Sequence, residues 1–200
     1  MKLVVATRNP GKIREFRALL EGLGYEILSM DHYPSIPPAE EKGETFEENA
    51  LEKARAAARF TGEMALADDS GLEVDALGGA PGVRSARFGG EDLSDAQRNR
   101  LLLERLKGVP MEERRARFRC VIALVTPRGE EYVVEGVCEG CIAMEPKGRH
   151  GFGYDPIFYL PSYGRTMAQI PPEEKNKISH RARALAKIRV ILEKLAGGGS

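Results

Sequence analysis

The sequence predicts a mixed α/β fold. Helical patterns alternate with short strand-like segments in the first half of the chain, which is typical of parallel strands joined by helices. Two longer strand-like segments follow at 118–125 and 132–142, and the turn residues Pro127-Arg128-Gly129-Glu130 between them indicate an antiparallel hairpin. The combination indicates a mixed sheet flanked by helices.

Length and charge limit the class of protein. With 200 residues, 42% of them hydrophobic, we expect one domain over 1–196, followed by a flexible Gly/Ser tail at 197–200. The 30 basic and 30 acidic side chains cancel, which leaves no global field for nucleic acid or a membrane surface. The start lacks a signal pattern, and no apolar run reaches the roughly 18 residues needed to span a bilayer. We therefore expect a cytoplasmic protein with neither nucleic acid nor membrane as a partner.

Three cysteines, an odd number, argue against a disulfide framework and favour a reducing compartment. Cys138 and Cys141 form a C-x-x-C pair, and Cys120 with His150 would complete four zinc ligands. The pair lies within a strand-like run that has no knuckle turn, so we favour small apolar core residues over the zinc alternative.

Patterns and caps place the remaining elements in order. A strand at 3–6 leads into a loop at 7–12, a helix at 12–21 and a second strand at 25–28. After a proline-containing loop, Thr45 and Glu48 form a capping box for a helix that Gly62 ends. A short buried strand at 64–67 then stops at Asp68-Asp69-Ser70-Gly71. Beyond it, apolar and polar residues alternate over 72–76.

Three elements are expected in the second half besides the hairpin. Ser94 with Gln97 caps a helix that Gly108 ends, and an apolar strand-like run covers 157–160. The segment from Pro146 to Pro172 otherwise indicates loops, and a last helix begins near His180.

The run Thr7-Arg8-Asn9-Pro10-Gly11-Lys12 is a candidate phosphate loop. A strand that leads into a helix start leaves backbone N–H groups and a positive dipole end at one point, and Arg8 and Lys12 add charge. The spacing is not that of the Walker motif. The alternative is an ordinary turn with surface charges.

Asp68 and Asp69 follow a buried apolar strand and offer hard oxygen ligands suited to Mg²⁺, with Glu40 and Glu41 as further candidates. The alternative is a solvated turn. Because this loop and the phosphate loop both follow predicted strands, they lie side by side if those strands are neighbours.

Two further segments suit a nucleotide. Phe152 and Tyr154 stand among glycines, where a ring is able to stack on a purine, although both also fit the core of a tight turn. Lys175 and Ser179-His180-Arg181 suit an anion near a helix start, and a neutral His180 suits a keto group. The alternative for these charges is a solvated helix face.

Together these motifs resemble the inosine triphosphate pyrophosphatase family, and the resemblance runs nearly end to end. It rests on several separated motifs in the right order, namely 7–12, Glu40-Glu41, 45–50, Ala67-Asp68-Asp69-Ser70-Gly71, Gly79-Ala80-Pro81-Gly82, 152–156, Lys175 and Ser179-His180-Arg181. The resemblance implies a long central mixed sheet in a two-lobed single domain with the active site in a cleft between the lobes, and a homodimer. It also implies hydrolysis of non-standard purine nucleoside triphosphates (ITP, dITP and XTP) to monophosphate and pyrophosphate.

The resemblance also implies roles for particular residues. Asp69 would be catalytic, binding Mg²⁺ and helping to activate water, and Glu41 would be a second metal contact. The triphosphate loop would be Thr7, Arg8, Asn9, Pro10, Gly11 and Lys12. The nucleoside and phosphate pocket would be lined by Ser70, Phe152, Gly153, Tyr154, Asp155, Lys175, His180 and Arg181. Arg8 stands where the family usually has a small residue, which leaves its role open.

The implied mechanism is attack of water on the α-phosphorus, with pyrophosphate as the leaving group. Donors from His180, Lys175 or backbone N–H groups would accept a 6-keto purine and leave a site donor unpaired against a 6-amino purine. Two alternatives remain, namely a different nucleotide pyrophosphatase of the septum-formation inhibitor type and a nucleotide-sensing module without catalysis. The adjacent Asp68 and Asp69 argue against the sensing module, because concentrated negative charge hinders phosphate binding without a metal.

Overall fold

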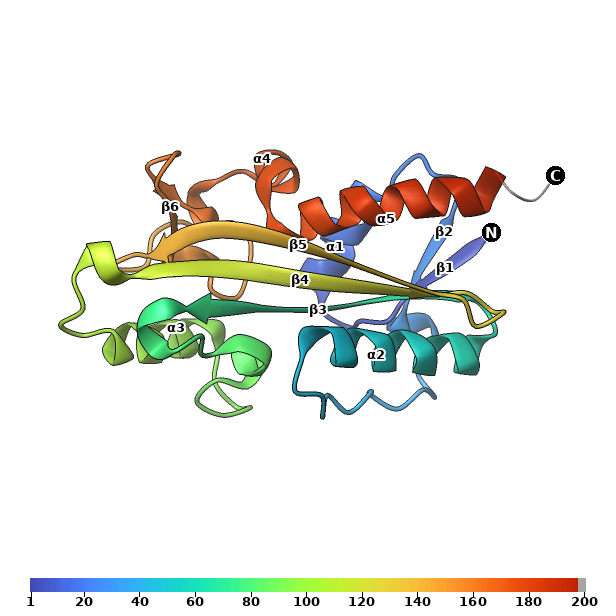
Figure 1. Cartoon of the computed structure of the whole chain (residues 1–200), viewed down its shortest axis with the longest axis horizontal. Coiled ribbons are helices and arrows are strands. Elements are labelled where there is room, and N and C mark those ends of the chain that lie inside the picture. The colour runs from blue at the N-terminus through green and yellow to red at the C-terminus, as the bar shows by residue number, and fades with distance from the viewer. Residues whose placement is uncertain (198–200) are drawn as a thin grey trace. The chain divides into compact units, whose positions relative to one another are not determined.

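A computed structural model describes residues 1–197 of the chain, which divide into two compact units. The first unit contains Met1–Asp69, Cys120–Gly136 and the described chain from Arg181 onward, and the second contains Ser70–Arg119 and Val137–His180. The expectation that they form one domain stays a prediction. Figure 1 labels the main helices and strands.

Seven strands form one sheet in the hydrogen-bonded order β2-β1-β3-β4-β5-β6-β7. Their bounds are β1 Lys2–Val5, β2 Glu26–Ser29, β3 Met64–Val74, β4 Arg115–Val125, β5 Glu131–Ile142, β6 Phe158–Leu160 and β7 Arg165–Thr166. The helices are α1 Pro10–Leu19, α2 Phe46–Thr61, α3 Asp95–Arg105, α4 Pro172–Ile178 and α5 His180–Gly197. β1 pairs in parallel with β2 and β3, whereas β6 pairs antiparallel with β5 and β7. The predicted mixed α/β fold is confirmed.

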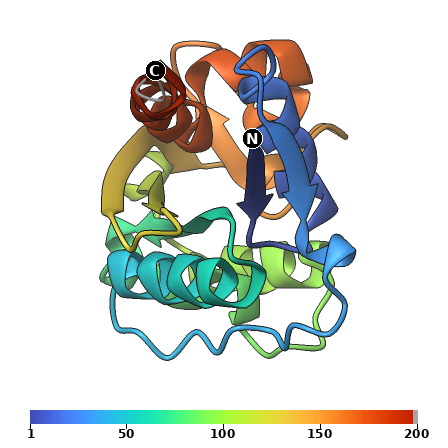
Figure 2. The same cartoon turned by 90° about the vertical axis from the view of Figure 1, so that its right-hand side faces the viewer.

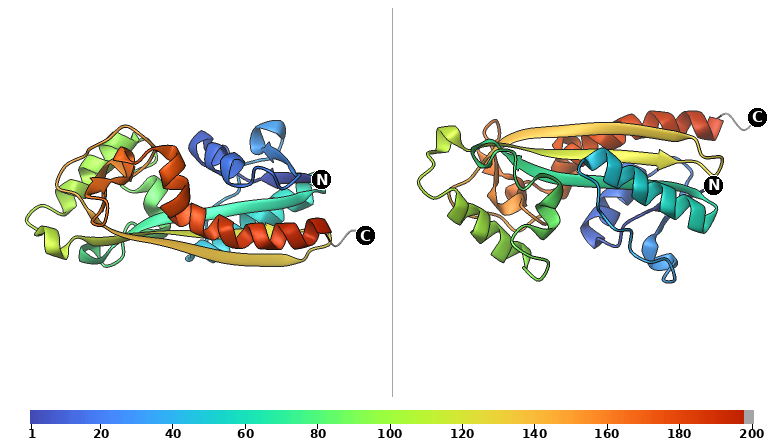
Figure 3. Two further views of the ribbon diagram at one scale, coloured as in Figure 1. Left: turned by 90° about the horizontal axis from the view of Figure 1, so that it is seen from above. Right: turned by 60° about the horizontal axis from the view of Figure 1, so that its bottom comes forward.

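In the first unit, helices cover both faces of the sheet, with α1 and α5 on one side and α2 on the other (Figure 2). Leu3 and Val5 of β1 pack with Phe16 of α1 and Leu185 of α5 in one apolar cluster. Val4, which points to the opposite face, is also fully buried. Figure 3 shows α5 running beside β5, where Lys187 donates a hydrogen bond to a β5 carbonyl at 2.6 Å.

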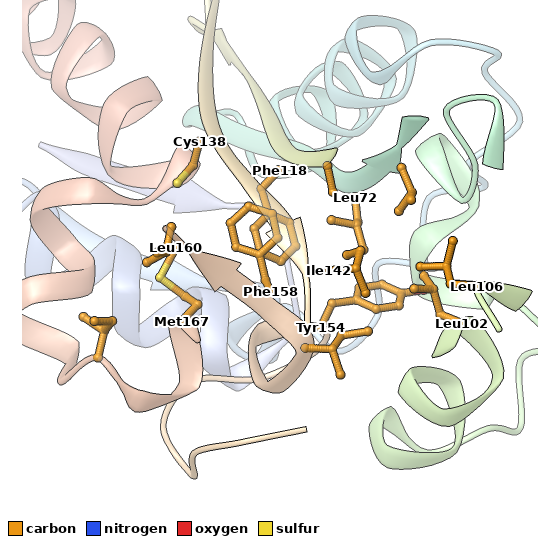
Figure 4. Close-up of a cluster of buried hydrophobic side chains, with 14 residues drawn as sticks. Leu72, Leu102, Leu106, Phe118, Cys138, Ile142, Tyr154, Phe158, Leu160 and Met167 are labelled. Atoms are coloured by element: carbon orange, nitrogen blue, oxygen red, sulfur yellow. The ribbon is translucent and has the colours of Figure 1, made fainter. Parts of the chain in front are cut away.

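In the second unit, apolar side chains of α3 pack against those of β3, β4, β5 and β6 and of the loops around β6 (Figure 4). The rings of Phe118 and Phe158 lie 4.3 Å apart between their centroids. Leu102 and Leu106 of α3 and Leu72 of β3 complete the same cluster. This packing fixes α3 relative to the loop that precedes β6, which matters for the site described below.

Two predictions about the acidic and phosphate segments are wrong in detail. β3 does not stop at residue 67 but continues through Asp68-Asp69-Ser70-Gly71 to Val74. The strand continues because cations contact both aspartates and the Asn49 amide also contacts Asp69, so tertiary contacts override the turn composition. α1 begins at Pro10, because Asn9 is its N-cap, and residues 10–12 are therefore helical rather than part of a loop.

The other expected elements agree closely with the structure. Thr45 caps α2, Gly62 ends it with φ of 68°, and both hydrogen bonds of the Ser94–Gln97 capping box are present. Sequence patterns did not reveal the short α4 and β7. Gly197, expected in the tail, is the last residue of α5, and the rest of that tail lies outside the described residues. Within residues 1–197, no helix is both long and apolar enough to cross a membrane.

Candidate active site

The phosphate loop is organised by Asn9 at the start of α1. Its Oδ1 accepts the backbone N–H groups of Gly11 and Lys12 at 2.9 and 3.1 Å, and Thr7 Oγ1 accepts the N–H of Asn9 at 3.1 Å. The sequence interpretation assumed that the N–H groups of this helix start were available, and the structure shows two of them capped by Asn9. What remains for an anion is the positive end of the helix dipole and the Lys12 ammonium.

Lys12 and Arg181 meet at Asp68, which is 3% exposed. Lys12 Nζ lies 3.1 and 3.0 Å from the two Asp68 oxygens, and Arg181 donates Nε and Nη2 to Oδ2 at 3.3 and 3.2 Å. Arg181 also pairs with Glu15 of α1. Burial alone would raise the pKa of Asp68, but the charges of Lys12, Arg181 and Lys53 lower it, so this carboxylate is ionised.

Asp69, the next residue, has different partners. Its Oδ2 accepts a hydrogen bond from Asn49 at 3.0 Å, and its Oδ1 lies 3.7 Å from Lys53. Asn49 and Lys53 are four residues apart on α2 and therefore share one helix face. Burial raises the pKa of Asp69 to about 6, with Glu41 reinforcing the rise and Lys53 and Asn49 opposing it. Two neighbouring carboxyl groups thus have pKa values pushed in opposite directions.

Glu41 and Asp69 converge on one cation. Lys53 Nζ lies 2.7 Å from Glu41 Oε1, so the same ammonium contacts both acids. Burial lowers the pKa of Lys53, but the surrounding carboxylates outweigh burial and raise it overall. Two hard oxygen donors facing one positive charge fit Mg²⁺, which takes one or two protein carboxylates and fills its other positions with water or phosphate. Glu40 instead pairs with Lys42 on the surface.

The zinc alternative has no support in the described part of the chain. No group of three or more His, Cys, Asp or Glu side chains in residues 1–197 is placed to hold a metal ion. None of the three cysteines forms a disulfide, and Cys120 and Cys138 are buried. They act as small apolar core residues, as the strand pattern predicts.

Arg8 has a structural contact in this geometry. Its Nη2 donates to the carbonyl of Ile36 at 2.9 Å, which ties the phosphate loop to the proline-containing loop after β2. The rest of Arg8 is exposed. Its predicted contact with substrate stays a prediction.

The second unit gathers the predicted base-binding residues around Asp155, which is 3% exposed. Asp155 Oδ2 accepts hydrogen bonds from Lys175 Nζ at 2.7 Å and from the N–H of Phe152 at 3.1 Å. Lys175 Nζ also lies 4.7 Å from the centroid of the Phe152 ring. A Cβ added to Gly151, whose φ is +73°, would lie 2.1 Å from Asp155, so only glycine fits there.

Two other predicted residues of this unit are core-facing. Tyr154 is 7% exposed, belongs to the core cluster and donates its hydroxyl hydrogen to the Ser85 carbonyl at 2.6 Å. This geometry agrees with the core alternative for its ring. His180 starts α5 and stacks on Phe118, with 4.7 Å between the ring centroids and 17° between the planes. Ser70, partly buried, follows Asp69 within β3.

The structure therefore brings together Lys12 and Asp68 as expected from the neighbouring β1 and β3, and Arg181 of α5 contacts the same carboxylate. It also adds residues that the sequence analysis did not assign, and Asn49 and Lys53 are the clearest. A usable signal was present, because Asn49 interrupts the apolar stripe of α2 and is only 2% exposed. A buried polar residue on a core-facing helix stripe requires a partner.

Comparison with known proteins agrees with this architecture. The Ham1 family profile matches residues 3–191. The dITP/XTP pyrophosphatase of Desulforamulus reducens is 56% identical over 195 residues, which cover 98% of this chain and 97% of that protein. A HAM1 protein from Coxiella burnetii has a TM-score of 0.88 at 46% identity, covering 97% of this chain and 99% of that one. The Ham1 protein of Staphylococcus aureus has a TM-score of 0.87 at 42% identity, covering 98% and 100%.

Fold and site define the class as a mixed α/β protein with buried acids and cations gathered beside the start of its first helix. Within that class, the chain belongs to the Ham1 family. The family resemblance inferred from the separated sequence motifs is confirmed.

Proposed function

We propose that this chain is a nucleoside triphosphate pyrophosphatase that hydrolyses dITP, XTP and ITP to the monophosphate and pyrophosphate. The observation that carries the proposal is the pair Asp68 and Asp69, in which Lys12 and Arg181 contact the first carboxylate and Asn49 and Lys53 contact the second. The names of the relatives, dITP/XTP pyrophosphatase, support the choice of substrate.

In this mechanism Asp69 is the catalytic base. Its carboxylate takes a proton from the water whose oxygen bonds to the α-phosphorus, and the bond from that phosphorus to the bridging oxygen breaks with pyrophosphate leaving. A carboxyl group with a pKa of about 6 is a stronger base than an ordinary aspartate and is still ionised at neutral pH. Asn49 holds one oxygen and thereby orients the other.

Lys12 neutralises the leaving pyrophosphate. The two carboxylate oxygens of Asp68 contact the Lys12 ammonium. An ammonium has three N–H donors, so one remains to bind phosphate. Because Asp68 is itself held by Arg181, Lys12 is oriented before substrate arrives. Asp68 therefore acts by positioning rather than by contact with the reacting atoms.

Mg²⁺ is the proposed cofactor, held by Asp69 and Glu41, and when bound it would neutralise phosphate charge and favour deprotonation of water. The two carboxylates contact the same ammonium and therefore lie close together, which supports this donor set, and Mg²⁺ would compete with Lys53 for them. Glu41→Gln should raise the Mg²⁺ concentration needed for half-maximal activity several-fold. Glu40→Gln is the matched control, because Glu40 is exposed and pairs with Lys42, and it should leave that concentration unchanged. Equal effects of the two variants would contradict the role of Glu41.

The predicted base contacts come from the second unit. Phe152 offers a partly buried ring, and Asp155 fixes Lys175 beside it. A donor from Lys175 favours a 6-keto purine over a 6-amino purine, and the predicted contact of the core-facing His180 with the base stays a prediction. A panel of dITP, XTP, ITP, dATP, dGTP and dCTP, assayed for pyrophosphate and orthophosphate, tests the proposal. Rapid pyrophosphate release confined to the first three supports it, and orthophosphate as first product contradicts it.

The enzyme is also proposed to act as a homodimer in the cytoplasm. The family resemblance supports the dimer, and three cysteines without a disulfide suit a reducing compartment. Light scattering coupled to size exclusion should give twice the chain mass, and a monomer at micromolar concentration would contradict the dimer. Cell fractionation tests the compartment.

A further inference from the structure

One residue of the second unit, Gly153, is held by α3 through both its N–H and its carbonyl group. The N–H of Gly153 donates to Asp95 Oδ2 at 2.9 Å, and the carbonyl of Gly153 accepts from Asn99 Nδ2 at 3.1 Å. Asp95 and Asn99 are four residues apart and share one face of the helix. Together they form a clamp on the residue that directly follows Phe152.

The clamp acts on a segment whose other contacts are also fixed. The N–H of Phe152 donates to Asp155, and the Tyr154 hydroxyl donates to the Ser85 carbonyl. Gly153, the residue between these two anchors, is the one that α3 holds. Asp95, Asn99 and Phe152 also border a cavity of about 610 Å³, a size typical of small-molecule sites. The position of the Phe152 ring at this cavity thus depends on the clamp.

Stability alone does not explain an asparagine at position 99. The residue is 3% exposed, and within residues 1–197 its Oδ1 has no hydrogen-bond partner. A buried amide oxygen without a partner lowers stability, whereas an apolar side chain at a buried helix position raises it. Asn99 is therefore retained at a cost in stability, which fits a role in placing the loop rather than in holding the fold together.

We propose that Asp95 and Asn99 are positioning residues for recognition of the purine base, and that they act by fixing the backbone of Gly153 and with it the Phe152 ring. The proposal rests on the proposed function, because it assigns Phe152 to the base. Asn99 contributes more than Asp95, since the Asp95 side chain is 60% exposed and its hydrogen bond competes with water. The affinity for ligands that carry a purine base should depend on the clamp, and the affinity for pyrophosphate should not.

The test compares two ligands in calorimetric titrations, inosine monophosphate and pyrophosphate. Asn99→Leu removes the orphan oxygen but also leaves the Gly153 carbonyl without its donor, so the two effects offset and the melting temperature should change little. Its dissociation constant for inosine monophosphate should rise by about fivefold, the equivalent of one lost hydrogen bond, with a matching rise in KM for dITP and little change in kcat. Affinity for pyrophosphate should stay the same.

Asp95→Ala provides a second variant at an exposed site, where folding is not at risk, and should weaken inosine monophosphate binding by about twofold. Asp95→Asn keeps an oxygen acceptor for the Gly153 N–H and should recover part of that loss. Ser94→Ala is the matched control, because it removes the cap of the same helix without touching Gly153. It should lower the melting temperature and leave inosine monophosphate binding unchanged.

The clamp is contradicted if Asn99→Leu and Asp95→Ala bind inosine monophosphate as the wild type does. It is also contradicted if they lose both ligands in proportion, or if Ser94→Ala weakens inosine monophosphate binding to the same extent. The wild type tests the proposed function separately. A wild-type protein that binds inosine monophosphate but releases no pyrophosphate from dITP contradicts the proposed function and leaves the clamp to be judged by the variants.

Discussion

Arg181 and Asp68 form a buried ion pair in which two guanidinium nitrogens lie 3.3 and 3.2 Å from one carboxylate oxygen. Arg181 is 1% exposed and Asp68 is 3% exposed, so water does not screen the pair. Lys12 contacts the same carboxylate from the start of α1. One acidic side chain in the middle of β3 therefore orients two cations that come from helices far apart in the sequence.

The first prediction concerns this pair. Asp68→Asn removes the charge that compensates Arg181 and Lys12, and a buried pair broken in this way costs about 3–5 kcal/mol. Urea denaturation should show that loss in the free energy of unfolding. Glu193→Gln, which breaks the exposed pair between Arg189 and Glu193, is the control and should cost about 0.5 kcal/mol or less. Similar losses in both variants would show that Asp68 is not the centre of a buried network.

The second prediction concerns pH and Asp69. Its pKa of about 6 in the folded protein exceeds the ordinary 3.8, so the folded state holds the proton more tightly than the unfolded chain. The ionised carboxylate therefore lowers stability above pH 6, and this penalty fades as the pH falls toward 4. Asp69→Asn should raise the free energy of unfolding by about 2–3 kcal/mol near pH 8 and by about zero near pH 4.

Chemical denaturation of the metal-free protein at both pH values measures this difference, and the same variant should lose most of its turnover. If the variant is less stable than the wild type near pH 8, the contacts of Asp69 with Lys53 and Asn49 stabilise its charged form by more than burial destabilises it. A variant that retains turnover would show that Asp69 is not the base.

The third prediction concerns the aromatic ring of the second unit. Phe152→Ala should raise KM for dITP with a smaller effect on kcat, because the ring is assigned to the base and not to the reacting phosphate. Steady-state kinetics measures the effects on KM and on kcat separately. Phe60→Ala, at an exposed site on α2, is the control. If KM is unchanged and only thermal stability falls, Phe152 is a core residue, which is the alternative that its sequence context left open.

The fold was largely accessible from the sequence because its signals are local. Caps at Thr45 and Ser94, the turn at 127–130 and the apolar stripes depend on neighbouring residues, and the structure reproduces them. The short α4 and β7 lack such periodic patterns, because seven and two residues are too few to show one. Local signals therefore predicted the long elements and three short strands but missed these two.

The candidate site was accessible in its residues but not in its geometry. Composition suggested that Asp68 and Asp69 end a strand, whereas β3 continues through them because cations from α1, α2 and α5 contact them. Those contacts are non-local, so no window of sequence contains them. The same limit hid Asn99 and the opposite pKa shifts of the two aspartates, whereas Asn49 left a signal as a polar residue in the apolar stripe of α2.

Hydrolysis of dITP in water enriched in ¹⁸O, followed by mass spectrometry of both products, shows directly which phosphorus atom the water attacks. Attack on the α-phosphorus places one ¹⁸O atom in dIMP and leaves pyrophosphate unlabelled. That is the result we expect for the wild type with Mg²⁺. Label in pyrophosphate, or release of orthophosphate as the first product, would contradict the account.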